Sequence, residues 1–330
     1  MALAKRRRSC WPTSRQPALD VTVQAQIMNL LEKLQEQRET AIVLITTTGL
    51  VAAHADRIMV MYAGKVVETG TTDEIFAEPR HAYTYGLLSS LARMDQAGRR
   101  SWSRSPGSRR TLAHVPSGCA FHPRCRFATS SCAEKTPELV QISDRPGPPP
   151  RLACTPTRWA RRRHAAEPAV PGSEARVAET SDGEPMLRNA GLTKSFPIRS
   201  GVRSSAPVGV VQAVDGIDLE IPEGQTLSLV GESGCGKSTA ARAILRLHEP
   251  TAGSVHVNGR DVTALGQGEL RAAREDMQIV FQDPYASLNP RMTVGRSCRR
   301  STSSSAVSSP TPRSRSCSRP WGSRPSTPSA

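Results

Sequence analysis

The sequence predicts an α/β fold organised around a glycine-rich loop, and three observations support this class. An apolar run, Gln225–Val230, leads directly into the glycine-rich stretch Gly231–Ser238, and a helical pattern follows over Lys237–Leu247. A second apolar run, Ala41–Thr46, has the length and β-rich composition of a buried parallel strand. Strand, loop and helix in this order are what phosphate-binding α/β folds require.

The N-terminal half carries alternating helix and strand patterns. Apolar residues at helical spacing predict a helix over Asp20–Gln37. Arg57–Tyr62 and Lys65–Glu68 flank Ala63 and Gly64, which predicts a hairpin. The remaining elements predicted in this half are three short helices: Val51–Asp56, Thr72–Phe76 and Tyr83–Leu91. Helices and strands thus alternate here as they do around the glycine-rich stretch.

A new domain is predicted to open near Met186. Val211–Ile221 alternates apolar and polar residues as a half-buried strand does. Ser254–Val257 is a second strand candidate, and the pair Asn258-Gly259 predicts the turn that ends it. Between the two halves, basic, Ser-rich and Pro-rich stretches predict disordered linkers.

The formal net charge of +15 invites a nucleic-acid interpretation, but its distribution argues against one. Residues 5–17 contain five basic side chains and no acid, and residues 296–330 contain seven arginines and no acid. Both stretches lack a helical or strand period and are predicted to be disordered. Most of the excess charge therefore lies outside the predicted domains, and we expect no specific nucleic-acid partner.

No apolar run approaches the roughly 18 residues that a membrane-spanning helix needs. The basic N-terminus, Met1 to Arg8, is not followed by the apolar region of a secretory signal. We therefore expect a protein that stays in the cytoplasm.

Residues 231–238 fit the motif G-x-x-x-x-G-K-[ST] without a mismatch, and Thr239 follows. Glycines let successive N–H groups point at phosphate oxygens, and the helix that follows adds its positive end. Lys237 is expected to reach the β- and γ-phosphates, and Ser238 to ligate Mg²⁺. A chance Gly/Ser turn is the alternative, which the preceding strand and following helix disfavour. The predicted ATP-binding residues are Gly231, Glu232, Ser233, Gly234, Cys235, Gly236, Lys237, Ser238 and Thr239.

The flanking residues of this loop resemble the ATP-binding proteins of peptide-import ABC transporters. Residues 280–295, beginning Val-Phe-Gln-Asp-Pro-Tyr-Ala-Ser-Leu-Asn-Pro, are similar to the Q-loop of that family, and residues 213–222 and 245–254 match it as well. The resemblance implies a P-loop NTPase fold that binds ATP and Mg²⁺. It also implies that Gln282 ligates Mg²⁺ and couples nucleotide to the membrane subunits. By position Phe196 would stack on adenine, although a core aromatic is an equal reading.

Residues 18–92 resemble the opposite end of the same kind of ATPase. Ala18, Leu19 and Asp20 look like its D-loop, and residues 55–70 and 79–88 look like the tail of a peptide or nickel importer's ATPase. The chain is thus similar to the end of one nucleotide-binding domain joined to the beginning of another, as in fused peptide and glutathione importers. Taken singly, each half is incomplete and is expected to lack core strands. The resemblance implies as partners two permease subunits, a solute-binding protein and a second ATPase domain, with the chain peripheral on the inner membrane face.

Three departures from the family concern hydrolysis. Ser9–Pro17 stands where the family has the acidic Walker B strand, and Thr46–Gly49 lacks the switch histidine. No Leu-Ser-Gly-Gly-Gln signature occurs, and its echo Leu265–Glu269 is interpreted as a surface turn. ATP hydrolysis needs a carboxylate that activates water. We therefore expect nucleotide binding at most, with hydrolysis very slow or absent.

A shifted reading frame is one hypothesis for the atypical stretches. With suitable codons, Ser9–Pro17 shifts to Glu-Leu-Leu-Ala-Asp-Glu-Pro-Thr-Thr, the family's Walker B phrase, and Ser316–Ser323 shifts to a helix-like phrase. A non-catalytic remnant of a broken gene is accordingly the alternative to an importer subunit. Re-reading the underlying DNA for frame tests the hypothesis.

Four cysteines outside these stretches and the loop form the pattern Cys119-x5-Cys125-x6-Cys132-x21-Cys154. Their spacing does not suit a zinc knuckle, and a reducing cytoplasm disfavours disulfides. Four thiolates suit an iron–sulfur cluster, and the segment resembles the C-terminal extension of oligopeptide-importer ATPases, where some members hold one. A 4Fe-4S cluster and unliganded thiols both stay open.

The predicted organisation divides the chain into seven segments. In order they are an out-of-frame-like stretch (1–17), the end of a first ABC ATPase domain (18–92), a linker (93–118), a cysteine-containing extension (119–155), a second linker (156–185), the beginning of a second ABC ATPase domain (186–295) and a basic, out-of-frame-like tail (296–330).

Overall fold

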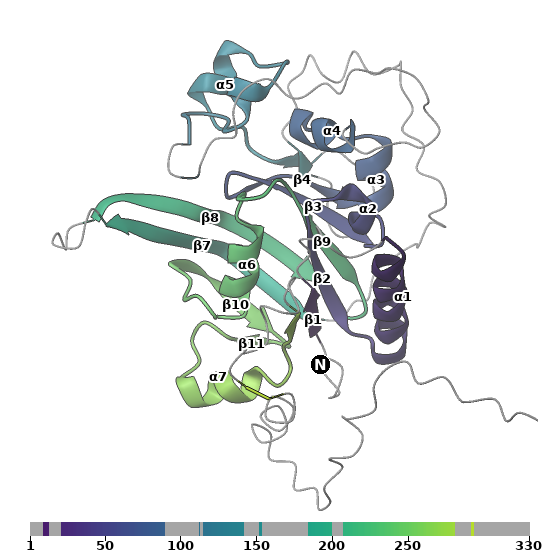
Figure 1. Ribbon diagram of the computed structural model, residues 1–330. Helices are drawn as coiled ribbons and strands as arrows, with labels where there is room; N and C mark the ends of the chain where they lie inside the picture. Colours follow the sequence, from purple (N-terminus) through teal and green to yellow (C-terminus); the bar gives the residue numbers. More distant parts are fainter. Residues whose placement is uncertain are drawn as a thin grey trace, which may run out of the picture. The chain divides into compact units, whose positions relative to one another are not determined.

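The computed structural model describes residues 9–12, 21–89, 112, 115–141, 152–153, 184–199, 207–280 and 292–293. Contacts separate Met1–Gln282 from Asp283–Ala330, and every element below belongs to the first unit (Figure 1). The predicted linker 156–185 lies almost wholly outside the described residues, as does the tail 296–330. No helix in the described part of the chain is long and apolar enough to cross a membrane.

The larger of two sheets has eight strands in the order β12-β1-β2-β9-β3-β4-β6-β5. Neighbours from β12 to β3 run parallel, and the pairs from β3 to β5 are antiparallel. The strands of this sheet are β1 Ser9–Pro12, β2 Ala41–Thr46, β3 Arg57–Tyr62, β4 Lys65–Thr71, β5 Val140–Gln141, β6 Leu152–Ala153, β9 Thr226–Val230 and β12 Ile279–Val280.

The two halves of the chain share this sheet. β9, from the C-terminal half, lies between β2 and β3 of the N-terminal half and pairs with both in parallel register. Leu229 is opposite Ile45 on one side and Met59 on the other. Strands of both halves therefore contribute to one sheet, in which β9 occupies the position between β2 and β3. The two pieces build one α/β unit.

Residues 9–12 correct one expectation. They were predicted to lack regular structure, yet they form β1, paired in parallel with β2 and β12. Main-chain hydrogen bonds from two flanking strands stabilise a strand whatever its side-chain period. β1 therefore occupies the sheet position beside β2 without an acidic residue in its sequence.

A second sheet has four antiparallel strands in the order β11-β10-β7-β8. Its strands are β7 Leu187–Arg199, β8 Pro207–Ile221, β10 Ala252–Val257 and β11 Arg260–Asp261. β8 and β10 contain the predicted strands, and Asn258 and Gly259 form the predicted turn, both with positive φ. β7 was not predicted, because its apolar alternation is interrupted where the β7–β8 register shifts around Gly191.

Helices were predicted within one to three residues at most ends. The helices are α1 Val21–Arg38, α2 Gly49–Ala52, α3 Thr72–Ala77, α4 Ala82–Ser89, η1 His122–Arg124, α5 Ser130–Glu134, α6 Lys237–Ile244 and α7 Gln267–Ala273. The interpretation of Leu265–Glu269 as a surface turn was wrong in part. α7 begins at Gln267, where the Glu269 side chain caps the N–H of Gly266 and Leu270 is buried.

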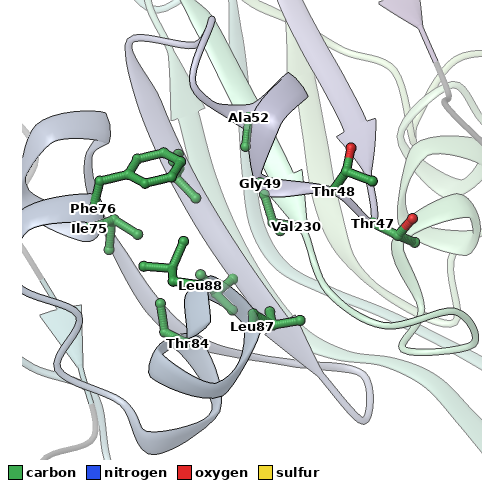
Figure 2. Close-up of a pocket in the computed structure, with 12 residues that line it drawn as sticks. Thr47, Thr48, Gly49, Ala52, Ile75, Phe76, Thr84, Leu87, Leu88 and Val230 are labelled. Atoms are coloured by element: carbon green, nitrogen blue, oxygen red, sulfur yellow. The ribbon is translucent and has the colours of Figure 1, made fainter. Parts of the chain in front are cut away.

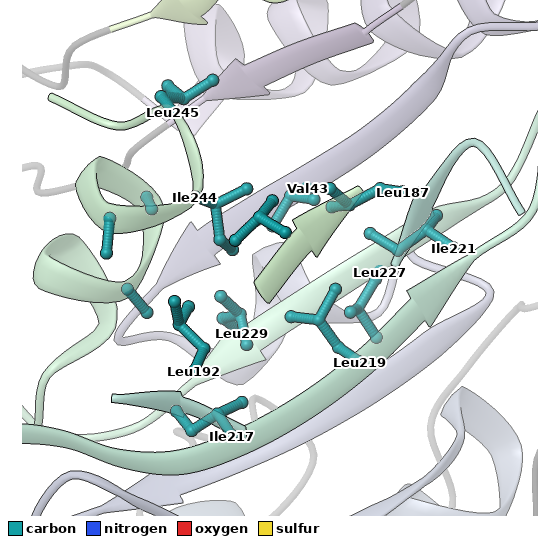
Figure 3. Packing of buried hydrophobic residues seen from close by; sticks show 14 of the residues in the cluster. Val43, Leu187, Leu192, Ile217, Leu219, Ile221, Leu227, Leu229, Ile244 and Leu245 are labelled. Carbon is teal, nitrogen blue, oxygen red and sulfur yellow. The ribbon is translucent and has the colours of Figure 1, made fainter. Parts of the chain in front are cut away.

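The core explains why the run Ala41–Thr46 is apolar throughout. Ile42 and Leu44 pack in one cluster with Met28 of α1, whereas Val43 and Ile45 belong to a cluster on the other face. That second cluster also contains residues of β9, α6 and the second sheet, as Figure 3 shows for Val43, Leu229, Ile244 and Ile217. Helices thus cover both faces of β2 and β9, as parallel strands require.

Candidate functional site

The glycine-rich loop connects β9 to α6 as predicted. Gly236 caps α6 with a φ of 109°, and a side-chain carbon added there would overlap the carbonyl oxygen of Ala213. At Gly231 an added carbon would overlap the carbonyl oxygen of Met61. Two glycines are therefore required by close backbone packing. Gly234, with a φ of 86°, has no atom within 4 Å of the position that its side chain would take.

Lys237 is buried, with 6% of its surface exposed, and its ammonium lies inside the loop. Its Nζ donates to the carbonyl oxygen of Gly231 at 2.7 Å and to that of Glu232 at 2.8 Å. A third contact, 3.3 Å long, reaches the Sγ of Cys235. The lysine thus bridges the start and the end of the loop and places a positive charge at its centre.

The polar groups of this loop are suited to bind the phosphates of a nucleoside triphosphate. Ser233, Gly234 and Ser238 are exposed, whereas Gly231, Gly236 and Lys237 are buried, so one side of the loop is open. The first N–H groups of α6 have no partner inside the helix and carry its positive end. The N–H groups on the open side and the ammonium inside the loop are hydrogen-bond donors of the kind that phosphate oxygens need, and the hydroxyl oxygen of Ser238 is a ligand of the kind that Mg²⁺ takes.

Residues of the N-terminal half form hydrogen bonds with the main chain of the loop. The N–H of Gly64 donates to the carbonyl oxygen of Cys235 at 2.9 Å, and the carbonyl of Gly64 accepts from Asp215 at 2.9 Å. The hydroxyl of Tyr83 accepts from the N–H of Glu232 at 2.6 Å. Burial is the main cause that raises the pKa of Tyr83 well above its ordinary value, so the phenol stays neutral. The hairpin β3–β4 and α4 therefore hold the loop through its main chain.

The Glu232 side chain has a partner that the sequence did not predict. Both Nη atoms of Arg124 donate to its carboxylate, each over 2.9 Å. This bidentate pair has side-chain exposures of 10% for Arg124 and 24% for Glu232. The hydrogen bonds to Glu232 raise the pKa of Arg124. Arg124 lies more than a hundred positions from the loop, and no pattern in the sequence relates the two.

The residues that follow β2 lie at the same sheet edge as the loop, because Thr46 pairs with Val230. The Thr46 hydroxyl lies 3.0 Å from the hydroxyl of Thr48 and accepts from its N–H at 3.0 Å. Thr47 and Thr48 border a cavity of about 160 Å³, whose wall is mostly apolar, including Phe76 and Val230 (Figure 2). Among the described residues, those that line this cavity include no acid or base.

The other predicted site residues are brought together only in part. Phe196 is half-buried on β7, where its ring meets His248 edge-on at 5.6 Å and Lys194 Nζ at 5.0 Å. Adenine stacking and a core role for Phe196 both stay predictions. Gln282, the Q-loop residue, lies outside the described residues, as does the D-loop, Ala18 to Asp20.

Three of the four predicted cluster cysteines lie in the described segment 115–141. The N–H of Cys119 donates to the carbonyl of Cys132 at 2.8 Å, and burial raises the pKa of the Cys119 and Cys125 thiols. Within the described residues no group of three or more ligating side chains could hold a metal. Cys154 lies outside them. The iron–sulfur cluster stays a prediction.

Two models of known protein families match separate parts of this chain. Residues 214–320 match the family model described as "ABC transporter", and residues 67–132 match "Oligopeptide/dipeptide transporter, C-terminal region". The first range covers the glycine-rich loop and continues into the basic tail. The second range covers β4, α3, α4 and the segment with Cys119, Cys125 and Cys132.

Curated relatives match most of the chain. The oligopeptide transport ATP-binding protein OppD of Mycobacterium tuberculosis is 42% identical over 278 residues, which are 84% of this chain and 45% of that protein. The glutathione import ATP-binding protein GsiA of Escherichia coli K12 is 38% identical over 281 residues, which are 85% of this chain and 36% of that protein. The chain thus spans less than half the length of these relatives.

A solved ATP-binding cassette, described as a post-hydrolysis dimer bound to ADP and Pi, matches 27% of this chain and 35% of its own chain. Its sequence identity is 30% and its TM-score is 0.23, so it adds nothing to the structural argument.

Proposed function

We propose that this chain is an ATP-binding component of a peptide importer, because residues 214–320 match the family model "ABC transporter" and residues 67–132 match "Oligopeptide/dipeptide transporter, C-terminal region". The loop with Lys237 at its centre carries this proposal, because it combines two sterically required glycines with an open, cationic edge. Nucleotide phosphates are the ligand that this combination binds. Lys237 would exchange its carbonyl contacts for the β- and γ-phosphates, and Ser238 would ligate Mg²⁺.

We expect the loop to hold the nucleotide, and in the part of the chain that the structure describes no carboxylate or histidine stands at the two positions where the family has the groups that activate water. β1 stands beside β2 with the sequence Ser-Cys-Trp-Pro, which contains no carboxylate. Thr46 and Thr48 are hydrogen-bonded to each other where the family has a histidine. General base catalysis needs a titratable group at hydrogen-bond distance from the attacking water. We therefore expect turnover far below about 1 s⁻¹, the low end of ordinary enzyme rates.

The partners follow from the family and belong to the same proposal. An importer component of this kind works with two permease subunits, a solute-binding protein and a second ATPase domain, peripherally at the inner face of the membrane. Gln282 is proposed as the link between nucleotide and permease, and an iron–sulfur cluster on the four cysteines stays a prediction from their number and from the family resemblance. The alternative, a non-catalytic remnant, differs in one measurable respect, because it binds nucleotide weakly or not at all.

Calorimetric titration of the full chain with Mg-ATP tests the proposal. The unaltered chain should bind, and Lys237→Ala should weaken binding by about a hundredfold or more, because a buried cation at the phosphates is removed. Lys33→Ala, which removes an exposed lysine on α1, should leave the affinity unchanged. No heat from folded protein, or an affinity that Lys237→Ala leaves intact, would contradict nucleotide binding. Phosphate release at or above about 1 s⁻¹ would contradict the catalytic part.

A further inference from the structure

Glu232 creates an electrostatic problem at the proposed site. It is the second residue of the loop, half-buried, and it carries a carboxylate next to the groups that would hold a triphosphate. Like charges brought together outside bulk water repel each other more strongly than they would in water. An uncompensated carboxylate at this position would therefore oppose the binding of any nucleotide.

The cysteine-containing segment supplies the compensating charge. Arg124 meets both carboxylate oxygens of Glu232, with two N–H···O distances of 2.9 Å. A bidentate arginine–carboxylate pair fixes geometry as well as charge, which a lysine cannot reproduce. At 10% exposure, the Arg124 side chain is largely shielded from solvent. The pair is thus unlike an exposed surface ion pair, which contributes little.

Contacts with residues outside the loop hold Arg124 in place. It ends η1, and its N–H donates to the carbonyl of Phe121 at 2.9 Å. Phe121 is 3% exposed and packs against Tyr62 and Tyr83, with ring centroids 5.2 and 5.4 Å apart. The guanidinium carbon lies 5.9 Å from the Tyr62 ring centroid and 5.6 Å from that of Phe121. These aromatic contacts favour the cation where it stands.

The same cluster holds the main chain of the loop. The Tyr83 hydroxyl accepts from the N–H of Glu232 while Arg124 binds the side chain of that residue. Both the backbone and the carboxylate of Glu232 are thus anchored by residues outside the motif. The Glu232 carbonyl remains the acceptor of Lys237. Displacing Arg124 would release the first turn of the loop on one side and leave the carboxylate charge unbalanced.

We propose that Arg124 is a positioning residue for nucleotide binding, which neutralises Glu232 and holds the first turn of the phosphate-binding loop. The inference rests on the proposed function, and it makes the cysteine-containing segment a determinant of nucleotide affinity. Arg124 itself acts through Glu232. The alternative is an ion pair that only stabilises the fold.

Mg-ATP titrations of the full chain separate these two roles. Arg124→Met keeps apolar packing over Tyr62 and Phe121 but removes the charge, and it should raise the Kd about tenfold. Glu232→Gln removes the opposing carboxylate and should bind at least as tightly as the unaltered chain. The double variant, with both changes, should return to within about threefold of the unaltered chain. Arg124→Lys should lie between the unaltered chain and Arg124→Met, because it restores the charge without the two-pronged contact.

A matched control removes a different ion pair. Arg188→Met breaks the pair with Glu220, whose side chains are 61% and 53% exposed, and should change the Kd less than threefold. Thermal unfolding by circular dichroism identifies the variants that are folded. If Arg124→Met does not fold, the Arg124→Lys and Glu232→Gln variants still decide, since the proposal requires that Arg124→Lys binds Mg-ATP more weakly than the unaltered chain and that Glu232→Gln does not.

The outcomes distinguish this inference from the proposed function. If the unaltered chain does not bind Mg-ATP, the proposed function fails and the role of Arg124 with it. If the unaltered chain binds and folded Arg124→Met binds equally well, only the positioning role is overturned. If Arg124→Met weakens binding and adding Glu232→Gln restores nothing, the pair is structural and charge compensation is refuted.

Discussion

Leu229 offers the sharpest test that the two halves form one cooperative unit. Its side chain is fully buried on β9, opposite Ile45 of β2 and Met59 of β3. Leu229→Ala removes three carbon atoms between strands of the other half. Substitutions of this kind cost about 2–5 kcal/mol, and with neighbours on both sides we expect about 3 kcal/mol. The thermal midpoint should fall by about 6–12 °C for a unit of this size.

Hydrogen exchange measured by mass spectrometry shows which segments lose stability in Leu229→Ala. Residues 41–46 and 57–62 are buried strands that flank β9, so their amides should exchange only when the unit opens. A loss of about 3 kcal/mol should then speed exchange in both strands by about a hundredfold. Leu247→Ala makes the same chemical change at a side chain that is 45% exposed and should alter stability by about 0.5 kcal/mol or less.

The result that refutes the reasoning is specific. If the N-terminal half folded independently of β9, Leu229→Ala would leave exchange at residues 41–46 and 57–62 unchanged. Two separate unfolding transitions, of which only one responds to the substitution, would lead to the same conclusion.

Two further predictions concern pH and backbone conformation. Burial lowers the pKa of His81 from 6.5 to about 4. As the pH falls, the unfolded chain therefore takes up this proton before the folded chain does. The free energy of unfolding should fall by up to about 3 kcal/mol between pH 6.5 and pH 4. His81→Asn keeps an acceptor for the N–H of Tyr83 and should flatten this slope in urea titrations; an unchanged slope assigns it to another group. Gly236→Ala should abolish Mg-ATP binding, whereas Gly216→Ala, with positive φ but open space, should bind normally. Equal binding by both would remove the steric argument.

Secondary structure was predictable where neighbouring residues in the sequence determine it. The run Ala41–Thr46 is apolar at every position because both faces of β2 are covered, and the hairpin at Ala63 and Gly64 follows from its turn residues. The glycine-rich loop was predictable for the same reason, since the chemistry of phosphate binding fixes residue types at close spacing.

Pairing between distant segments was not predictable. The run Thr226–Val230 predicts a buried strand but does not predict that its neighbours are β2 and β3. An apolar strand can pair with any other strand, because its composition does not determine which one. Tyr83 and Arg124 meet the loop only through that arrangement, and a lone tyrosine or arginine in a sequence carries no such information. Ser9–Pro12 became a strand through its neighbours' hydrogen bonds, which its own residues do not indicate.

The position of β9 between β2 and β3 has a topological consequence. Its neighbours β2 and β3 come early in the chain, whereas β9 itself comes much later and is followed only by β10, β11 and β12. Closing a long loop costs little more than closing a short one, so connectivity does not dictate which halves associate. Two copies of this chain could therefore exchange halves, each lending its β9 to the other, and assembly would then depend on concentration rather than on chain order alone.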